Sequence, residues 1–228
     1  MHRFSMRSIV VALGFVLACG STVLGETVYS NISSSADVDE SLTARPVGFS
    51  NVSNPNLMYA QGFTSGTANL DVQSILVGLG ADAPISSAQV RLFSNTIVSG
   101  SNLPDAPIAT FTGTTAVENT AAYLFTGSFT LQPSTPYWVV VSDAAAGSES
   151  SFSYYDVESD AQPSGTSGYA YLDTRRSSNG GSTWLNFSAG DALSVSITAV
   201  PEPGAYALAG IGLATAGLMR WRRRKAAR

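Results

Sequence analysis

The chain has 228 residues, and residues 26–199 hold 15 acidic side chains against four basic ones. Such an acidic segment would repel nucleic-acid phosphates, so composition argues against a DNA or RNA partner. Only one cysteine is present, so no disulfide can stabilise the fold, and a stable domain must depend on its buried core.

The N-terminus predicts an export signal over residues 1–25. Two arginines precede an uncharged run over residues 8–20, and small residues lead to a cleavage point after Gly25. The segment Val-Leu-Ala-Cys at residues 16–19 also resembles a lipobox, in which Cys19 would be lipidated and become the first mature residue. A buried helix or an uncleaved anchor is a further alternative, and the sequence leaves these readings open.

Residues 26–56 are expected to form a flexible leader or a first strand, and residues 57–199 an ectodomain rich in strands. Short bursts of aromatic and β-branched residues alternate there with turn sequences, and no run has the period of a helix. The bursts predict strands at residues 57–64, 72–80, 89–93, 108–111, 123–129, 137–141, 152–155, 169–172 and 193–198. Their number and spacing predict an all-β fold, an antiparallel β-sandwich of jelly-roll-like type.

Alternation within these runs predicts which side chains face the core. In the run 72–80, Ile75 and Val77 share the side expected to be buried, and Val72 lies on the other side. Residues 193–198 alternate apolar and polar side chains, which is typical of a half-buried strand. A turn is expected at residues 102–105, Asn-Leu-Pro-Asp.

The C-terminal tail, residues 200–228, predicts a transmembrane helix. Residues 205–219 are uncharged, and at about 1.5 Å per residue this run and its flank span roughly 25 Å, slightly short for a bilayer. Positive flanks stay in the cytoplasm, which places the ectodomain outside the inner membrane. An amphipathic surface helix is the alternative. The basic residues that would form the cytoplasmic end are Arg220, Arg222, Arg223, Arg224 and Lys225.

Pro201, Glu202 and Pro203 stand directly before the apolar run. This order of Pro-Glu-Pro, apolar span and arginine cluster resembles the PEP-CTERM sorting signal. The resemblance implies processing near the motif by an exosortase, a membrane transpeptidase of Gram-negative bacteria that make extracellular polysaccharide. Two prolines keep the backbone extended, which suits a segment that an enzyme must reach.

The order of segments in residues 59–198 resembles a second family, the choice-of-anchor domains of the type labelled R. This resemblance implies display at the cell surface and no assigned activity. The residues that carry it lie at 60–66, 90–94, 103–104, 108–110, 136–141 and 182–184.

The sequence offers no recognisable catalytic set. Beyond the signal there is no histidine or cysteine, and no lysine before the tail. Serine triads, cysteine nucleophiles, histidine-based zinc sites and Schiff-base lysines are therefore excluded as usually built. Paired carboxylates could still hydrolyse glycosides, but no motif selects a pair. We expect neither enzymatic activity nor a cofactor.

Two weaker hypotheses concern ligand binding. Asp156, Glu158 and Asp160 place carboxylates at alternate positions, which could bind calcium, although a solvated acidic loop is the simpler explanation. The aromatic residues Trp184, Tyr154 and Tyr155 could stack on sugar rings or merely cap the core, whereas Trp138 is expected in the core.

Together these features predict an exported, non-catalytic protein of the cell surface or extracellular matrix. It would be held in the inner membrane during transit and then reach the surface. Its expected partners are the exosortase and the membrane, with extracellular polysaccharide as a further candidate. A carbohydrate- or calcium-binding module is the alternative function, and a glycoside hydrolase is the third.

Overall fold

The computed structural model describes residues 25–32, 38, 44–48, 56–113, 115–145, 152–157, 164–165, 168–187 and 192–201. The predicted signal up to residue 24, which includes Cys19, and the tail beyond Pro201 lie outside these residues. Within the described part of the chain, no helical segment has the length and apolar character needed to cross a bilayer.

Every regular element in the described residues is a β-strand, and every pair of neighbouring strands is antiparallel, which confirms the all-β, antiparallel expectation. The strands are β1 Glu26–Ser30, β2 Ala44–Val47, β3 Met58–Thr64, β4 Leu70–Ala81, β5 Ala88–Val98, β6 Ser101–Gly113, β7 Ala121–Leu131, β8 Pro136–Asp143, β9 Phe152–Val157, β10 Ser164–Gly165, β11 Ala170–Ser177, β12 Leu185–Asn186, β13 Ala192–Leu193 and β14 Val195–Pro201.

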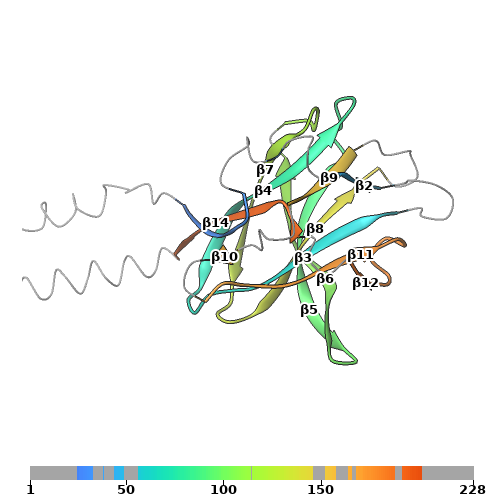
Figure 1. Cartoon of the computed structure of the whole chain (residues 1–228). Helices are drawn as coiled ribbons and strands as arrows, with labels where there is room; N and C mark the ends of the chain where they lie inside the picture. The colour runs from blue at the N-terminus through green and yellow to red at the C-terminus, as the bar shows by residue number, and fades with distance from the viewer. Residues whose placement is uncertain are drawn as a thin grey trace, which may run out of the picture.

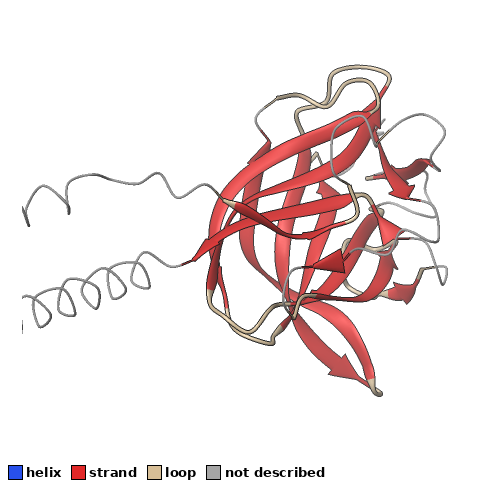
Figure 2. Cartoon of the chain, turned by 60° about the vertical axis from the view of Figure 1, so that its left-hand side comes forward, coloured by secondary structure: helices blue, strands red, loops and turns tan. Residues whose placement is uncertain are grey.

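The strands form one sheet that closes on itself at β4. β4 pairs with β14 along one edge and with β7 along the other, and β9 joins it at its far end. From β14 the order runs through β1, β10, β11, β3, β8, β5 and β6 to β7, which returns to β4. The strands therefore curve around a common interior (Figures 1 and 2).

The interior contains the main apolar core. Ile75 and Val77 are fully buried in it, as predicted. Val72 is buried in the same cluster, so its predicted place on the opposite side is wrong. The register between β4 and β7 shifts between Val72 and Ser74, and this bulge reverses the alternation of side chains.

The run at 193–198 also departs from its half-buried pattern. Leu193, Val195 and Ile197 are fully buried, but Ser194 and Ser196 are buried as well, with exposed fractions of 0% and 7%. A second apolar cluster, which includes Ile32 and Val38, packs close by, and a Cβ atom added at Gly78 would contact both Ser194 and Val38. The strand is therefore covered on both faces.

The turn expected at residues 102–105 is absent, because these residues lie inside β6. β5 and β6 instead form one long hairpin that projects from the body (Figure 1), and its turn is at Ser99 and Gly100. Both turn residues have positive φ, 51° and 80°, a geometry that matches the twist of a two-residue hairpin. At Pro104, β6 pairs with β5 alone among the described residues, so this part of β6 is an edge strand. An edge strand tolerates proline because the missing N–H can face away from the neighbouring strand.

A third apolar cluster covers the opposite face of β3, β8 and β5. It is centred on Trp138, which is fully buried as predicted, and it includes Met58, Ala60, Phe93 and Val140. In the register of the sheet, Trp138 lies between Gly62 and Phe93. The central strand β8 is therefore buried on both faces.

Candidate functional site

The two ends of the folded part meet at one pole of the molecule, which we call the junction pole. β1 begins at Glu26, which pairs with Ala199 of β14, and β14 ends at Pro201, which pairs with Leu70 of β4. Figure 1 shows β1 in blue beside β14 in orange. The residue after the predicted cleavage point therefore pairs with Ala199, two residues before the Pro-Glu-Pro motif begins.

Pro201 is the last residue of the sheet, not a free linker residue. Ala199, two residues before it, is buried, at 1% exposed. The pairing of β1 with β14 begins at Ala199, so β1 does not reach Pro201. Proline has no backbone N–H, and because β1 is not paired with Pro201, no hydrogen bond to β1 is lost there. The strand predicted over residues 193–198 ends at Thr198, whereas β14 continues to Pro201, and the apolar pair Ala199-Val200 is the local signal for this continuation.

β4 sets the distance between the junction pole and the opposite end, the far pole. Leu70 lies at the junction pole and Ala81 at the far pole, twelve residues along one strand. At roughly 3.3 Å per residue the two poles are about 36 Å apart. Glu202, Pro203 and the basic group at Arg220, Arg222, Arg223, Arg224 and Lys225 lie outside the described residues.

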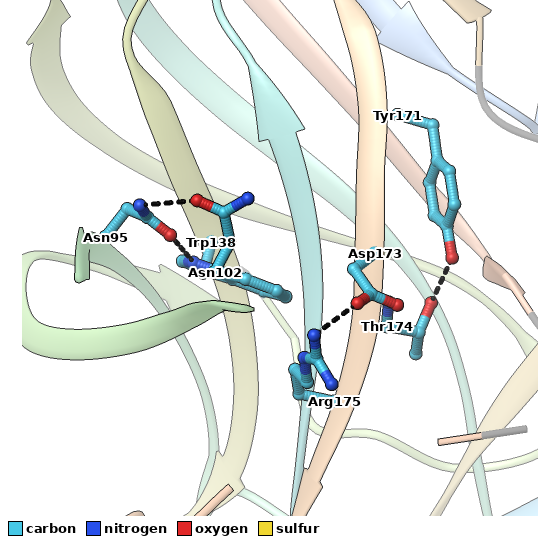
Figure 3. Close-up of polar contacts among 7 residues, drawn as sticks. All are labelled: Asn95, Asn102, Trp138, Tyr171, Asp173, Thr174 and Arg175. Atoms are coloured by element: carbon cyan, nitrogen blue, oxygen red, sulfur yellow. Dashed lines mark hydrogen bonds and ion pairs between the residues drawn. The ribbon is translucent and has the colours of Figure 1, made fainter. Parts of the chain in front are cut away.

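A row of polar contacts crosses the outer face beside Trp138 (Figure 3). The indole Nε1 of Trp138 donates to Oδ1 of Asn95 at 2.9 Å, and Nδ2 of Asn95 donates to Oδ1 of Asn102 at 2.9 Å. These bonds connect β8 to the β5–β6 hairpin. Because the polar atoms satisfy one another, we interpret the row as a structural brace of the hairpin.

Arg175 and Asp173 form an ion pair on β11 in the same view (Figure 3). The Arg175 side chain is 6% exposed and that of Asp173 39%. The carboxylate thus compensates the buried guanidinium within the protein. Nearby, the hydroxyl groups of Tyr171 and Thr174 are 3.0 Å apart.

The structure does not bring the three predicted glycan-binding aromatics together. Tyr154, Tyr155 and Trp184 belong to different apolar clusters. Tyr154 is fully buried and Tyr155 is 9% exposed, whereas Trp184 is half-buried and packs edge-on against Phe93 at 6.5 Å. Sugar stacking by these three aromatic residues stays a prediction. Their side chains lie in different clusters and do not form one common surface on which a sugar ring could stack.

The calcium hypothesis falls mostly outside the described residues. The backbone of Asp156 lies in β9 and pairs with Leu193, and Glu158 and Asp160 are not described. Within the described ranges, no three carboxylate, histidine or cysteine side chains gather closely enough to hold a metal ion. Calcium binding stays an untested prediction.

Comparison with known families identifies the tail. Residues 199–225 match the family model described as the PEP-CTERM protein-sorting motif, and this match overlaps the last three residues of β14. The chain matches no curated protein. The motif indicates a protein that is sorted to the surface of a Gram-negative cell through an exosortase, a membrane enzyme.

Proposed function

We propose that the chain is a non-catalytic component of the cell surface or extracellular matrix, whose all-β ectodomain acts by interaction or display. The observation that carries this proposal is the sorting motif at residues 199–225, which continues directly from β14. A domain joined to the motif without a spacer would emerge close to the membrane, where a membrane transpeptidase can reach the connection.

The proposal includes an organisation of the whole chain. Residues 1–25 act as the export signal, residues 26–199 form a jelly-roll-like sandwich with its first strand at β1, and residues 200–228 form the sorting tail. The apolar run 205–219 spans the inner membrane, and the arginine-rich end stays in the cytoplasm. The closed antiparallel sheet supports the sandwich interpretation, and the matched motif supports the tail.

The chemistry of the ectodomain supports a non-catalytic role. Residues 26–200 contain no histidine, cysteine or lysine, so the histidine-, cysteine- and lysine-based catalytic sets are missing from the sequence itself. Of the carboxylates that the structure describes, Asp173 is engaged with Arg175 and Asp71 accepts a hydrogen bond from Thr130. These contacts serve the fold.

Substitution of the motif tests the proposal in a host that contains an exosortase. We expect the double variant Glu202→Ala, Pro203→Ala to accumulate untrimmed in the membrane fraction, because the processing enzyme loses its recognition segment. Pro201 is left unchanged because it belongs to β14. A matched control, Glu118→Ala with Pro133→Ala in exposed loops, should be trimmed and displayed normally. Normal trimming and display of the motif variant would overturn the proposal.

A further inference from the structure

A polar hollow lies at the far pole, away from the sorting junction. Its volume is about 480 Å³, within the range of roughly 300 to 1,000 Å³ that is typical of small-molecule sites. The hollow is formed where β4 ends against β9 and the start of β7. Its walls are Gly80, Ala81, Asp82, Asn119, Thr120, Ser153 and Tyr155.

The absence of a side chain at Gly80 creates space in this hollow. A Cβ atom at this position would lie 2.8 Å from Cε2 of Tyr155, closer than real Cβ atoms approach, and 3.0 Å from Oγ1 of Thr120, which is a tight contact. The Thr120 hydroxyl donates to the Tyr155 hydroxyl at 2.9 Å. Because the Tyr155 oxygen accepts that bond, its own proton is available to a ligand.

Three further polar groups line the hollow without using their hydrogen-bonding capacity internally. The carboxylate of Asp82, the side-chain amide of Asn119 and the hydroxyl of Ser153 form no hydrogen bond within the described residues. The backbone N–H of Asn119 donates to Ala81 at 3.0 Å and its φ is +58°, so the loop is held in place while the amide stays available. The hollow thus combines fixed hydroxyl groups with a free amide and a free carboxylate.

The donor and acceptor set selects a class of ligand. Among the described residues, no arginine or lysine lines the hollow, so these walls offer an anionic ligand no counter-charge. The one carboxylate that the described residues place in the hollow, that of Asp82, falls short of the six to eight oxygens that calcium requires. Hydroxyls, an amide and one carboxylate together offer several donors and acceptors, the pattern that complements a molecule rich in hydroxyl groups. We propose that the hollow binds a neutral hexose unit of a saccharide.

This inference does not depend on the sorting route, because the hollow and the sorting motif lie at opposite poles. A sugar held here would face away from the pole at which the tail leaves. The residues involved differ from the aromatic set predicted from the sequence, except for Tyr155, which contributes its hydroxyl and not its ring face.

Binding of the exported protein to an array of immobilised neutral and acidic saccharides tests the proposal, with free glucose, galactose and mannose as competitors. We expect binding to neutral hexose-containing saccharides and competition by at least one free hexose. Asn119→Gly removes the amide and keeps a backbone that glycine adopts readily, so it should weaken binding about tenfold without unfolding the protein. Ser134→Gly, another residue with positive φ but at the junction pole, is the matched control.

Two outcomes would overturn the proposal. One is the absence of binding to any neutral saccharide, including binding to acidic saccharides alone. The other is equal binding by Asn119→Gly and the unmodified protein. Gly80→Ala gives a second check, because its Cβ displaces Tyr155 or Thr120, and a variant that keeps its circular dichroism spectrum should also lose binding.

Discussion

Gln61 is the polar centre of an otherwise apolar core. Its Oε1 accepts from the backbone N–H of Leu193 at 3.0 Å and from Oγ1 of Thr174 at 3.3 Å. Its Nε2 donates to the hydroxyl of Tyr29 at 3.2 Å. One fully buried side chain therefore connects β1, β3, β11 and β13, and its partners are left without a hydrogen bond if it is lost.

Replacing Gln61 by leucine should be strongly destabilising, because it leaves the partners of Gln61 buried without a hydrogen bond. We expect Gln61→Leu to lower the free energy of unfolding by about 3 kcal/mol, measured by urea denaturation. Gln73→Leu, at an exposed position of β4, is the control and should change it by less than about 0.5 kcal/mol. Equal effects of the two substitutions would show that the buried network adds no stability.

Tyr29 makes stability sensitive to alkaline pH. Burial raises the pKa of its phenol above the usual value of about 10, although the hydrogen bond from Gln61 opposes this shift. Above pH 10 the unfolded chain can ionise this group while the folded chain cannot. The stabilising effect is therefore complete below about pH 10 and is lost as the pH rises further.

The substitution Tyr29→Phe removes this titration. We expect its free energy of unfolding to decline less steeply above about pH 10 than that of the unmodified protein, in urea titrations at several pH values. Identical slopes for Tyr29→Phe and the unmodified protein would refute this account.

At the scale of elements, close approach between β3 and β8 depends on Gly62. It pairs with Trp138 across the sheet, and an added Cβ atom would lie 2.8 Å from Cζ3 of the indole. Asn95 holds the indole through its Nε1, so the ring cannot move away freely. The two strands and the β5–β6 hairpin are thus coupled through one aromatic side chain.

The variant Gly62→Ala should therefore be destabilising through overpacking, by about 1 to 3 kcal/mol in thermal or urea unfolding. Trp138→Phe removes part of the ring that the new methyl group contacts. In a double-mutant cycle we expect the cost of Gly62→Ala to be smaller in the Trp138→Phe background. Additive costs in the two backgrounds would mean that the indole does not limit the space at Gly62.

Most strands could be predicted from the sequence because apolar bursts and turn residues are local signals. The extension of the β5–β6 hairpin could not, because Pro104 reads as a turn residue unless its place on a strand edge is known. The position of Val72 depends on a bulge in the pairing of β4 with β7, which only the folded arrangement of these strands determines. Hydrogen bonds of Gln61 to residues as distant as Leu193 likewise need the folded arrangement.

At the scale of the whole molecule, the closed sheet brings the two ends of the ectodomain together. β14 lies between β1 and β4, so the strand that leads into the sorting motif is held on both sides. The tail was recognisable from sequence because its three features follow one another along the chain. The shared pole of both ends and the polar hollow opposite it depend on pairings between distant segments, which no local pattern reveals.

The intact mass of the protein recovered from the cell surface tests sorting through the C-terminal motif most directly. We predict a species that lacks the signal and all residues beyond the Pro-Glu-Pro region, and that is therefore clearly lighter than the 23.7 kDa of the full chain. Trimming at this end together with surface location would establish the sorting route. Recovery of the untrimmed, full-length polypeptide dissolved in the cytosol would contradict it.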